Sequence, residues 1–273
     1  MSKVKELEVA LFLEALYQVY GVDLKNNSKS SLTRRLNVLV MQQKKESISE
    51  LIPLLIHKKK FYYEVINAVT VQCSNLFRDP QFFKKMKKKV FTYLQTFPKA
   101  NIWIAGCANG EEIYSLLILL KEANLLHKVR VYATDLNTHA LQIAKSGVLT
   151  KKIDSTDIDN YNKSGGMYSL SDYFVTGYGK YKLKDELLSN VVFEEHNLAQ
   201  DGPFISAEFI LCRNVMIYFN KELQEKVVKL LDTSLVPNGY LGIGIDESLE
   251  FIRTAKHYKK IKDSISIYKK LSN

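Results

Sequence analysis

Apolar residues in the first part of the chain recur at the spacing of an α-helix. Residues 7–19 carry leucine, alanine and valine near that spacing, and residues 32–40 form a second stripe of the same kind. Gly21 lies between the two stripes and is a natural helix stop. We therefore predict a small all-helical N-terminal domain over residues 1–72.

After Pro98 the pattern changes, because short apolar runs now alternate with helical stretches. The predicted strands cover residues 101–107, 129–134, 191–193, 208–212 and 240–245, and the predicted helices cover residues 111–123, 138–145 and 221–235. Alternation of this kind predicts an α/β fold, a parallel sheet with helices on both faces, over residues 73–273. Residues 258–269 differ, and we expect them to form an antiparallel hairpin on the sheet edge.

Residues 146–190 fit neither pattern. Gly165, Gly166, Gly177 and Gly179 are interleaved there with six aromatic residues, which favours short strands joined by tight turns. We predict an inserted antiparallel β-subdomain. Asp79-Pro80, further upstream, reads as the N-cap and first residue of a helix, because aspartate accepts free amides and proline needs no partner.

Composition removes several classes of protein. The first residues contain no apolar signal-peptide core, and no apolar run approaches the roughly 18 residues of a membrane span. Three widely spaced cysteines do not make a disulfide framework, and five histidines show no metal-ligand spacing. We expect a reduced, cytoplasmic protein without a metal and without membrane insertion, and a monomer.

The charge is unevenly spread. Residues 1–100 carry 18 basic and 8 acidic side chains, whereas residues 101–273 carry 21 of each, so the formal charge of +10 lies in the first hundred residues. Such asymmetry indicates an acidic partner for the N-terminal part.

Ligands of an open parallel sheet bind beyond the carboxyl ends of its strands. There, residues 105–112 combine a glycine loop with Glu111 and Glu112, which suits a cationic ligand better than a pyrophosphate. Asp135 follows the next strand, where a carboxylate can accept both hydroxyls of a ribose. Asp135 could instead cap the next helix, as Asn137 or Thr138 also could.

The loop and the acid together favour a nucleoside cofactor. The absence of G-x-G-x-x-G and the presence of the added acids favour S-adenosylmethionine over NAD. A third segment, residues 211–219, carries Asn214, which can hold polar groups of a cofactor, and Tyr218, which can reach over its reacting end. Singly, these two residues would more often be a satisfied strand-end amide and a core tyrosine.

Together these segments resemble the CheR family of chemotaxis receptor methyltransferases, which transfer methyl groups from S-adenosylmethionine to receptor glutamates. The matching motifs are Phe77-Arg78-Asp79, Gly106-Cys107 with Gly110 to Ser115, Ala133 to Leu136, His196-Asn197-Leu198 and Cys212 to Phe219. The resemblance covers roughly residues 70–250, and residues 20–24 and 34–36 resemble the helical N-terminal domain of the family. It implies a Rossmann-like methyltransferase sheet.

The resemblance also implies roles. Arg78 and Tyr218 would lie nearest the transferred methyl group, and Arg78 would also face the cofactor. The other implied cofactor contacts are Gln72 and Ser74, Glu112 with or without Glu111 at the ammonium, Asp135 at the ribose, Asn197 and Leu198 at the adenine, and Asn214 and Val215 on the methionine side. Lys29, Arg34 and Arg35 would meet the acidic helices of methyl-accepting receptors. Gln72 stands where the family usually has asparagine, and Ala108-Asn109 stands where it usually has Ser-Thr.

Two other functions remain open at this point. A nucleic-acid methyltransferase would use the same cofactor, and the +10 charge would suit phosphates. However, such enzymes usually carry an Asn-Pro-Pro-Tyr-like segment where this chain has residues 213–216, so we expect no nucleic acid as substrate. A non-catalytic binding module would explain the charge but not the cofactor residues. The short loop near residue 178 favours an enzyme that needs no tethering receptor peptide.

Overall fold

The computed structural model describes residues 3–22, 24, 29–69, 74–250, 252–262 and 266–272, except the side chains at positions 29 and 31. The chain divides into two compact units. The first comprises residues 1–72 with 218–226, and the second comprises residues 73–217 with 227–273.

The first unit is helical, as the apolar stripes predict. Its helices are α1 (Lys3–Tyr20), α2 (Lys29–Gln42), α3 (Leu51–His57) and α4 (Lys59–Val69). Phe12 and Leu16 of α1 and Leu36 of α2 are fully buried. Val22 pairs with Phe219 in an isolated antiparallel bridge, which attaches residues 218–226 to this unit.

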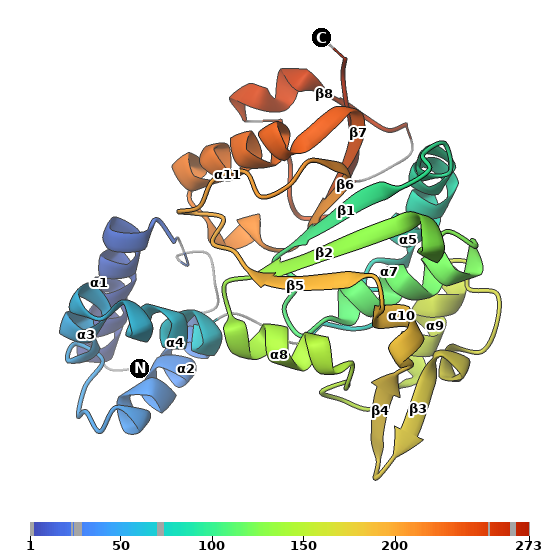
Figure 1. Cartoon of the computed structure of the whole chain (residues 1–273). Coiled ribbons are helices and arrows are strands. Elements are labelled where there is room, and N and C mark those ends of the chain that lie inside the picture. Colours follow the sequence, from blue (N-terminus) through green and yellow to red (C-terminus); the bar gives the residue numbers. More distant parts are fainter. Residues whose placement is uncertain are drawn as a thin grey trace. The chain divides into compact units, whose positions relative to one another are not determined.

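The second unit is built on a seven-stranded sheet with the order β5-β2-β1-β6-β7-β9-β8 (Figure 1). The strands are β1 (Ala100–Ala105), β2 (Val129–Asp135), β5 (Val191–Glu195), β6 (Ala207–Cys212), β7 (Leu235–Ile243), β8 (Tyr258–Lys260) and β9 (Ile267–Lys270). The first five are mutually parallel, while β9 runs antiparallel to β7 and β8 runs antiparallel to β9. The predicted α/β sheet and its final hairpin are thus confirmed.

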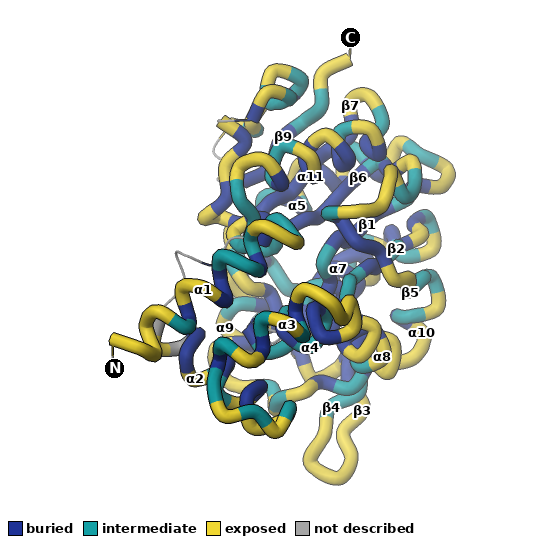
Figure 2. The backbone as a smooth tube through the Cα atoms, turned by 90° about the vertical axis from the view of Figure 1, so that its left-hand side faces the viewer, coloured by how far each residue is buried: buried dark blue, intermediate teal, exposed yellow. Residues whose placement is uncertain are grey.

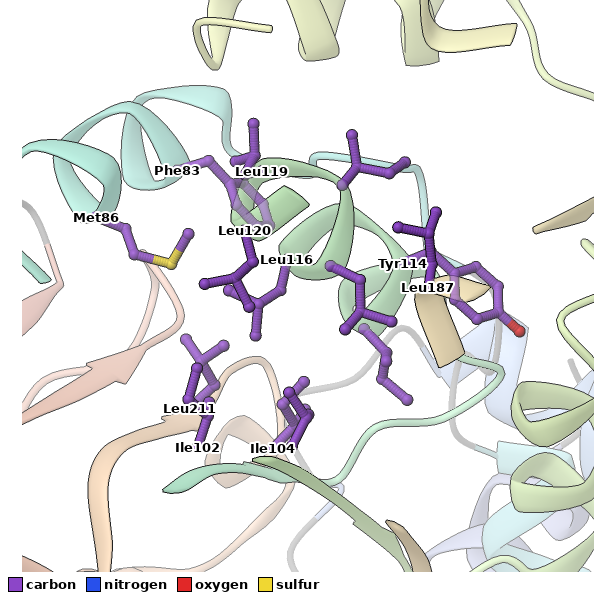
Figure 3. Packing of buried hydrophobic residues seen from close by; sticks show 14 of the residues in the cluster. Phe83, Met86, Ile102, Ile104, Tyr114, Leu116, Leu119, Leu120, Leu187 and Leu211 are labelled. Carbon is purple, nitrogen blue, oxygen red and sulfur yellow. The ribbon is translucent and has the colours of Figure 1, made fainter. Parts of the chain in front are cut away.

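Helices α7 (Glu111–Glu122), α8 (Thr138–Ser146) and α11 (Lys221–Ser234) follow β1, β2 and β6. Figure 3 shows Leu116 and Leu120 of α7 gathered over Ile102 of β1, and Phe83 and Met86 belong to the same buried cluster. Trp103 points to the opposite face because side chains alternate along a strand. Figure 2 shows how completely β1 and β6 are buried.

Helix α5 (Pro80–Met86) begins at proline as predicted, and it continues through the π-helical turn η1 (Lys87–Phe91) into α6 (Thr92–Leu94). Asp79 stands at the N-cap position as predicted, but the expected side-chain cap is absent. Asp79 has a left-handed backbone (φ 62°). Its carboxylate instead forms an ion pair with the buried Arg213.

Residues 146–190 contain one hairpin, β3 (Phe174–Gly177) with β4 (Lys180–Leu183), two α-helices, α9 (Ser155–Lys163) and α10 (Asp185–Leu188), and the 3-10 helix η3 (Leu170–Tyr173). The hairpin is the antiparallel element that the glycine and tyrosine pattern predicts, and Figure 2 shows its exposed tip. Helix α9 was not predicted. It is held by a capping box in which Asp154 and Asp157 accept each other's backbone amides.

Candidate active site

The candidate site lies at the carboxyl ends of β1 and β6. From β1 the chain first continues to one side of the sheet, through β2 to β5. It then returns to the other side of β1, through β6 to β7, so the strand order reverses between β1 and β6. In open α/β sheets this reversal leaves a crevice for a ligand. The loops after β1, β2 and β6 carry the residues that the sequence predicts.

The loop after β1 is held close to the sheet by its backbone amides. Gly106 and Cys107 both donate to the carbonyl of Thr134, at 2.8 and 3.0 Å. Gly106 has a φ of 80°, and a Cβ there would overlap the Cγ2 methyl of Val215. Only glycine therefore fits between the loops after β1 and β6, and this close approach brings two predicted cofactor segments together.

Asp135 ends β2 and binds that loop through its carboxylate. Oδ2 accepts the amide of Ala108 at 2.8 Å, and Oδ1 accepts the amide of Asn137 at 2.9 Å. Burial raises the pKa of Asp135, and the amide donors oppose this rise. Asn137, not Asp135, caps α8, because its Oδ1 accepts the amides of His139 and Ala140. The capping alternative for Asp135 is thereby removed.

Glu111 and Glu112 open α7 but have different partners. Thr150 Oγ1 donates to Glu111 Oε1 at 3.4 Å, and burial raises the pKa of Glu111 to about 7. Glu112 Oε2 accepts from Arg213 Nη1 at 3.3 Å. Burial also raises the pKa of Glu112, against the lowering effect of Arg213. The structure thus surrounds Glu112, rather than Glu111, with the charged groups of the site.

Two hydrogen bonds to side chains hold the backbone of the segment before α5. Asp157 Oδ1 accepts the amide of Leu76 at 2.9 Å, and Ser115 Oγ accepts the amide of Phe77 at 2.8 Å. The Arg78 side chain, which follows, is exposed. Ser74 is half-buried and donates to the carbonyl of Asn75, at 3.4 Å. Gln72 lies outside the described residues.

The loop after β6 turns sharply at Asn214, which has a φ of 60°. Glu247, in the loop after β7, accepts the amides of Asn214 and Ile217 at 3.0 and 3.2 Å. Sequence reasoning assigned no role to Glu247, although an acid in a turn after a buried strand is a signal for such anchoring. It also assigned no role to Arg213, which pairs with both Asp79 and Glu112.

Asn197 and Leu198, the predicted adenine residues, follow β5 and are buried. The side-chain oxygen of Asn197 accepts a hydrogen bond from the backbone amide of Ala199 at 2.9 Å. The backbone amide of Asn197 donates to the Asp201 carboxylate at 2.7 Å. The neighbouring His196 stacks edge-on against Trp103. Asn197 thus shapes this turn.

The remaining predicted residues belong to the helical unit. Tyr218 ends the short helix η4 (Met216–Tyr218) and is half-buried. On α2, Arg34 is exposed, whereas Arg35 Nη1 donates to the carbonyl of Ala68 on α4 at 3.1 Å. The side chain of Lys29 lies outside the described residues.

Among the buried polar atoms that have no hydrogen-bond partner within the described chain, two atoms of the site suit the predicted cofactor. Glu112 Oε1 is an acceptor and Asn214 Nδ2 is a donor. Burying such atoms without partners is costly, so they indicate a ligand that supplies both partners. The amino-acid tail of S-adenosylmethionine carries an ammonium and a carboxylate, which are a donor and an acceptor. The residues present therefore fit the cofactor.

The described residues contain no cluster of His, Cys, Asp and Glu that could hold a metal ion. No helix of the described chain is long and apolar enough to cross a membrane.

Comparison with known proteins places the chain in one family. Residues 72–266 match the CheR methyltransferase SAM binding domain, and residues 7–70 match the CheR methyltransferase all-alpha domain. The chain is 34% identical to Cher3 of Pseudomonas putida over 97% of both chains. It is 31% identical to chemotaxis protein methyltransferase 1 of Pseudomonas aeruginosa, over 94% of this chain and 95% of that protein.

A third relative is the chemotaxis protein methyltransferase of Borreliella burgdorferi, at 27% identity over 93% of this chain and 94% of that protein. The matched domains span nearly the whole chain, and one of them is the cofactor domain whose site is described above. The chain therefore belongs to the CheR methyltransferase family and is an S-adenosylmethionine-dependent methyltransferase.

Proposed function

We propose that this enzyme methylates glutamate side chains on the cytoplasmic helices of chemotaxis receptors. The observation that carries the proposal is the exposed guanidinium of Arg78 on a segment fixed by Asp157 and Ser115, close enough to Glu112 to lower the pKa of that residue. A positive charge held at the edge of a cofactor site suits a carboxylate substrate. The names of the Pseudomonas aeruginosa and Borreliella burgdorferi relatives support chemotaxis as the setting.

Different residues of the site would contact different parts of the cofactor. Glu112 Oε1 accepts from the ammonium, and Asn214 Nδ2 donates to the carboxylate of the same tail. Asp135 takes the ribose hydroxyls while remaining bound to the amide of Ala108, which keeps its carboxylate in place. The other contacts are Gln72, Ser74 and Arg78 from the segment before α5, Val215 on the methionine side, and Asn197 and Leu198 at the adenine.

Bound S-adenosylmethionine supplies a methyl group activated by its sulfonium. A substrate glutamate with its usual pKa of about 4.3 is already ionised at neutral pH, so the protein needs no general base. Its task is alignment, which is worth up to ~7–11 kcal/mol in favourable cases. Arg78 would orient the attacking carboxylate, and the resemblance to the family implies that Tyr218 would lie near the transferred methyl group.

The helical unit supplies the surface for the receptor. Residues 1–72 carry 11 basic and 7 acidic side chains, and receptor methylation segments are long helices rich in glutamate and glutamine. Arg34 offers an exposed guanidinium on α2, and Lys29 and Arg35 belong to the same helix. Long-range attraction between such surfaces raises the rate of encounter and weakens with salt.

One experiment tests the substrate class. The protein is incubated with methyl-labelled S-adenosylmethionine and either receptor-containing membranes or RNA, and the product is then treated with alkali. A carboxyl methyl ester releases labelled methanol, whereas an N-methylated base does not. Stable label on RNA, or no transfer to receptors under conditions in which the cofactor binds, would refute the proposal.

A further inference from the structure

Arg213, the first residue after β6, is buried between two acids. Its Nη2 donates to Asp79 Oδ2 at 2.7 Å, and its Nη1 donates to Glu112 Oε2 at 3.3 Å. Nη2 also donates to the carbonyl of Arg78 at 3.2 Å. The guanidinium lies 4.2 Å from the ring centroid of Phe82, which closes one face of it. The side chain is 1% exposed.

These contacts connect the cofactor-binding part of the site with the segment proposed to bind the substrate. Glu112 is the proposed ammonium acceptor on α7, and Arg78 is the proposed substrate residue before α5. One planar guanidinium reaches both elements because its donors are fixed in a fork, which the single ammonium of a lysine cannot reproduce. A purely apolar core residue could fill the space but could not donate to either element.

We propose that Arg213 is a positioning residue, which keeps Glu112 charged and oriented for the cofactor and holds the backbone that presents Arg78. The proposal rests on the proposed function, in which Glu112 accepts the ammonium of the cofactor.

The charged neighbours of Glu112 determine how its protonation depends on pH. Burial raises the pKa of Glu112, and the nearby Glu247 and Asp79 raise it further, whereas Arg213 and Arg78 lower it. Of the two cations, only Arg213 is bonded to the carboxylate in the structure. Without Arg213, Glu112 would take up a proton at higher pH and would then lose its charge for the ammonium.

The test measures the affinity of the full chain for S-adenosylhomocysteine by calorimetry at about pH 6 and about pH 8.5, because the protonation of Glu112 depends on pH. Affinities are expressed relative to the wild type at each pH, which cancels the titration of the ligand's own amino group. We expect Arg213→Gln to lose roughly tenfold more affinity at the lower pH than at the higher pH. Arg130→Gln, at an exposed arginine on β2, is the matched control and should change nothing.

Asp79→Asn provides a second test with the opposite sign, and it decides the question if Arg213→Gln does not fold. Asp79 raises the pKa of Glu112, so its neutralisation should leave affinity at about pH 6 at least as high as in the wild type. A purely structural role predicts losses of equal size at both pH values in both variants, and that result would overturn the proposal.

Glu112→Gln tests the proposed ammonium contact separately from the proposed positioning role of Arg213. If this variant binds S-adenosylhomocysteine as tightly as the wild type, the proposed ammonium contact itself is wrong. If Glu112→Gln weakens binding but Arg213→Gln keeps the wild-type pH profile, only the positioning role of Arg213 fails.

Discussion

Substitution of Glu111 by glutamine measures the free energy held in one buried carboxyl group. Glu111 is 2% exposed, and burial raises its pKa to about 7. The unfolded chain releases the same proton at a pH of about 4.3. The interval between the two pKa values corresponds to roughly 3–4 kcal/mol, at about 1.4 kcal/mol for each pH unit.

The sign follows from the number of bound protons. Between the two pKa values the folded chain binds more protons than the unfolded chain, so its free energy of unfolding falls as the pH rises. Glutamine has no proton to release. Glu111→Gln should therefore exceed the wild type in free energy of unfolding by about 1 kcal/mol at pH 5 and by roughly 3–4 kcal/mol at pH 8.

Guanidinium unfolding followed by circular dichroism at both pH values gives this difference directly. Glu250→Gln, at an exposed glutamate, is the control and should show no pH-dependent gain. If the free energy of unfolding rises by the same amount at pH 5 and pH 8, or falls at pH 8, then burial does not disfavour the ionised form of Glu111.

Three further predictions concern the proposed site. Arg78→Ala should abolish methyl transfer and weaken binding of S-adenosylhomocysteine by a much smaller factor, because Arg78 is expected to act mainly on the substrate carboxylate; undiminished turnover would contradict this role. Asp135→Asn should lower cofactor affinity by roughly tenfold or more in calorimetry, because its amide group cannot accept both backbone amides and also the ribose hydroxyls. Arg34→Glu should slow receptor methylation and flatten its dependence on ionic strength, and an unchanged salt profile would argue against electrostatic attraction.

The elements of the fold could be predicted where one local signal dominates. Strands β1, β2 and β6 are short apolar runs that end in small or polar residues, and these runs mark the positions of Gly106, Asp135 and Asn214. The side chains of the site are therefore found at strand ends, which a sequence pattern can locate without any knowledge of distant contacts.

The partners of those side chains could not be predicted in this way. Arg213 pairs with Asp79, 134 residues earlier, and no local spacing connects them. The same pairing explains why the Asp79 side chain does not cap α5, although its local sequence is that of a helix cap. Helix α9 was missed for a related reason, since its apolar contribution is small and the tyrosines and glycines around it indicate strands.

Asp157 ties the inserted segment to the candidate site. The residue lies on α9, inside the segment that interrupts the sheet, yet it fixes the backbone next to Arg78 through the amide of Leu76. The β3–β4 hairpin, by contrast, ends in the fully exposed Tyr178 between two glycines with free space around them. The insertion thus has an exposed outer tip and an inner helix, α9, that supports the segment carrying Arg78.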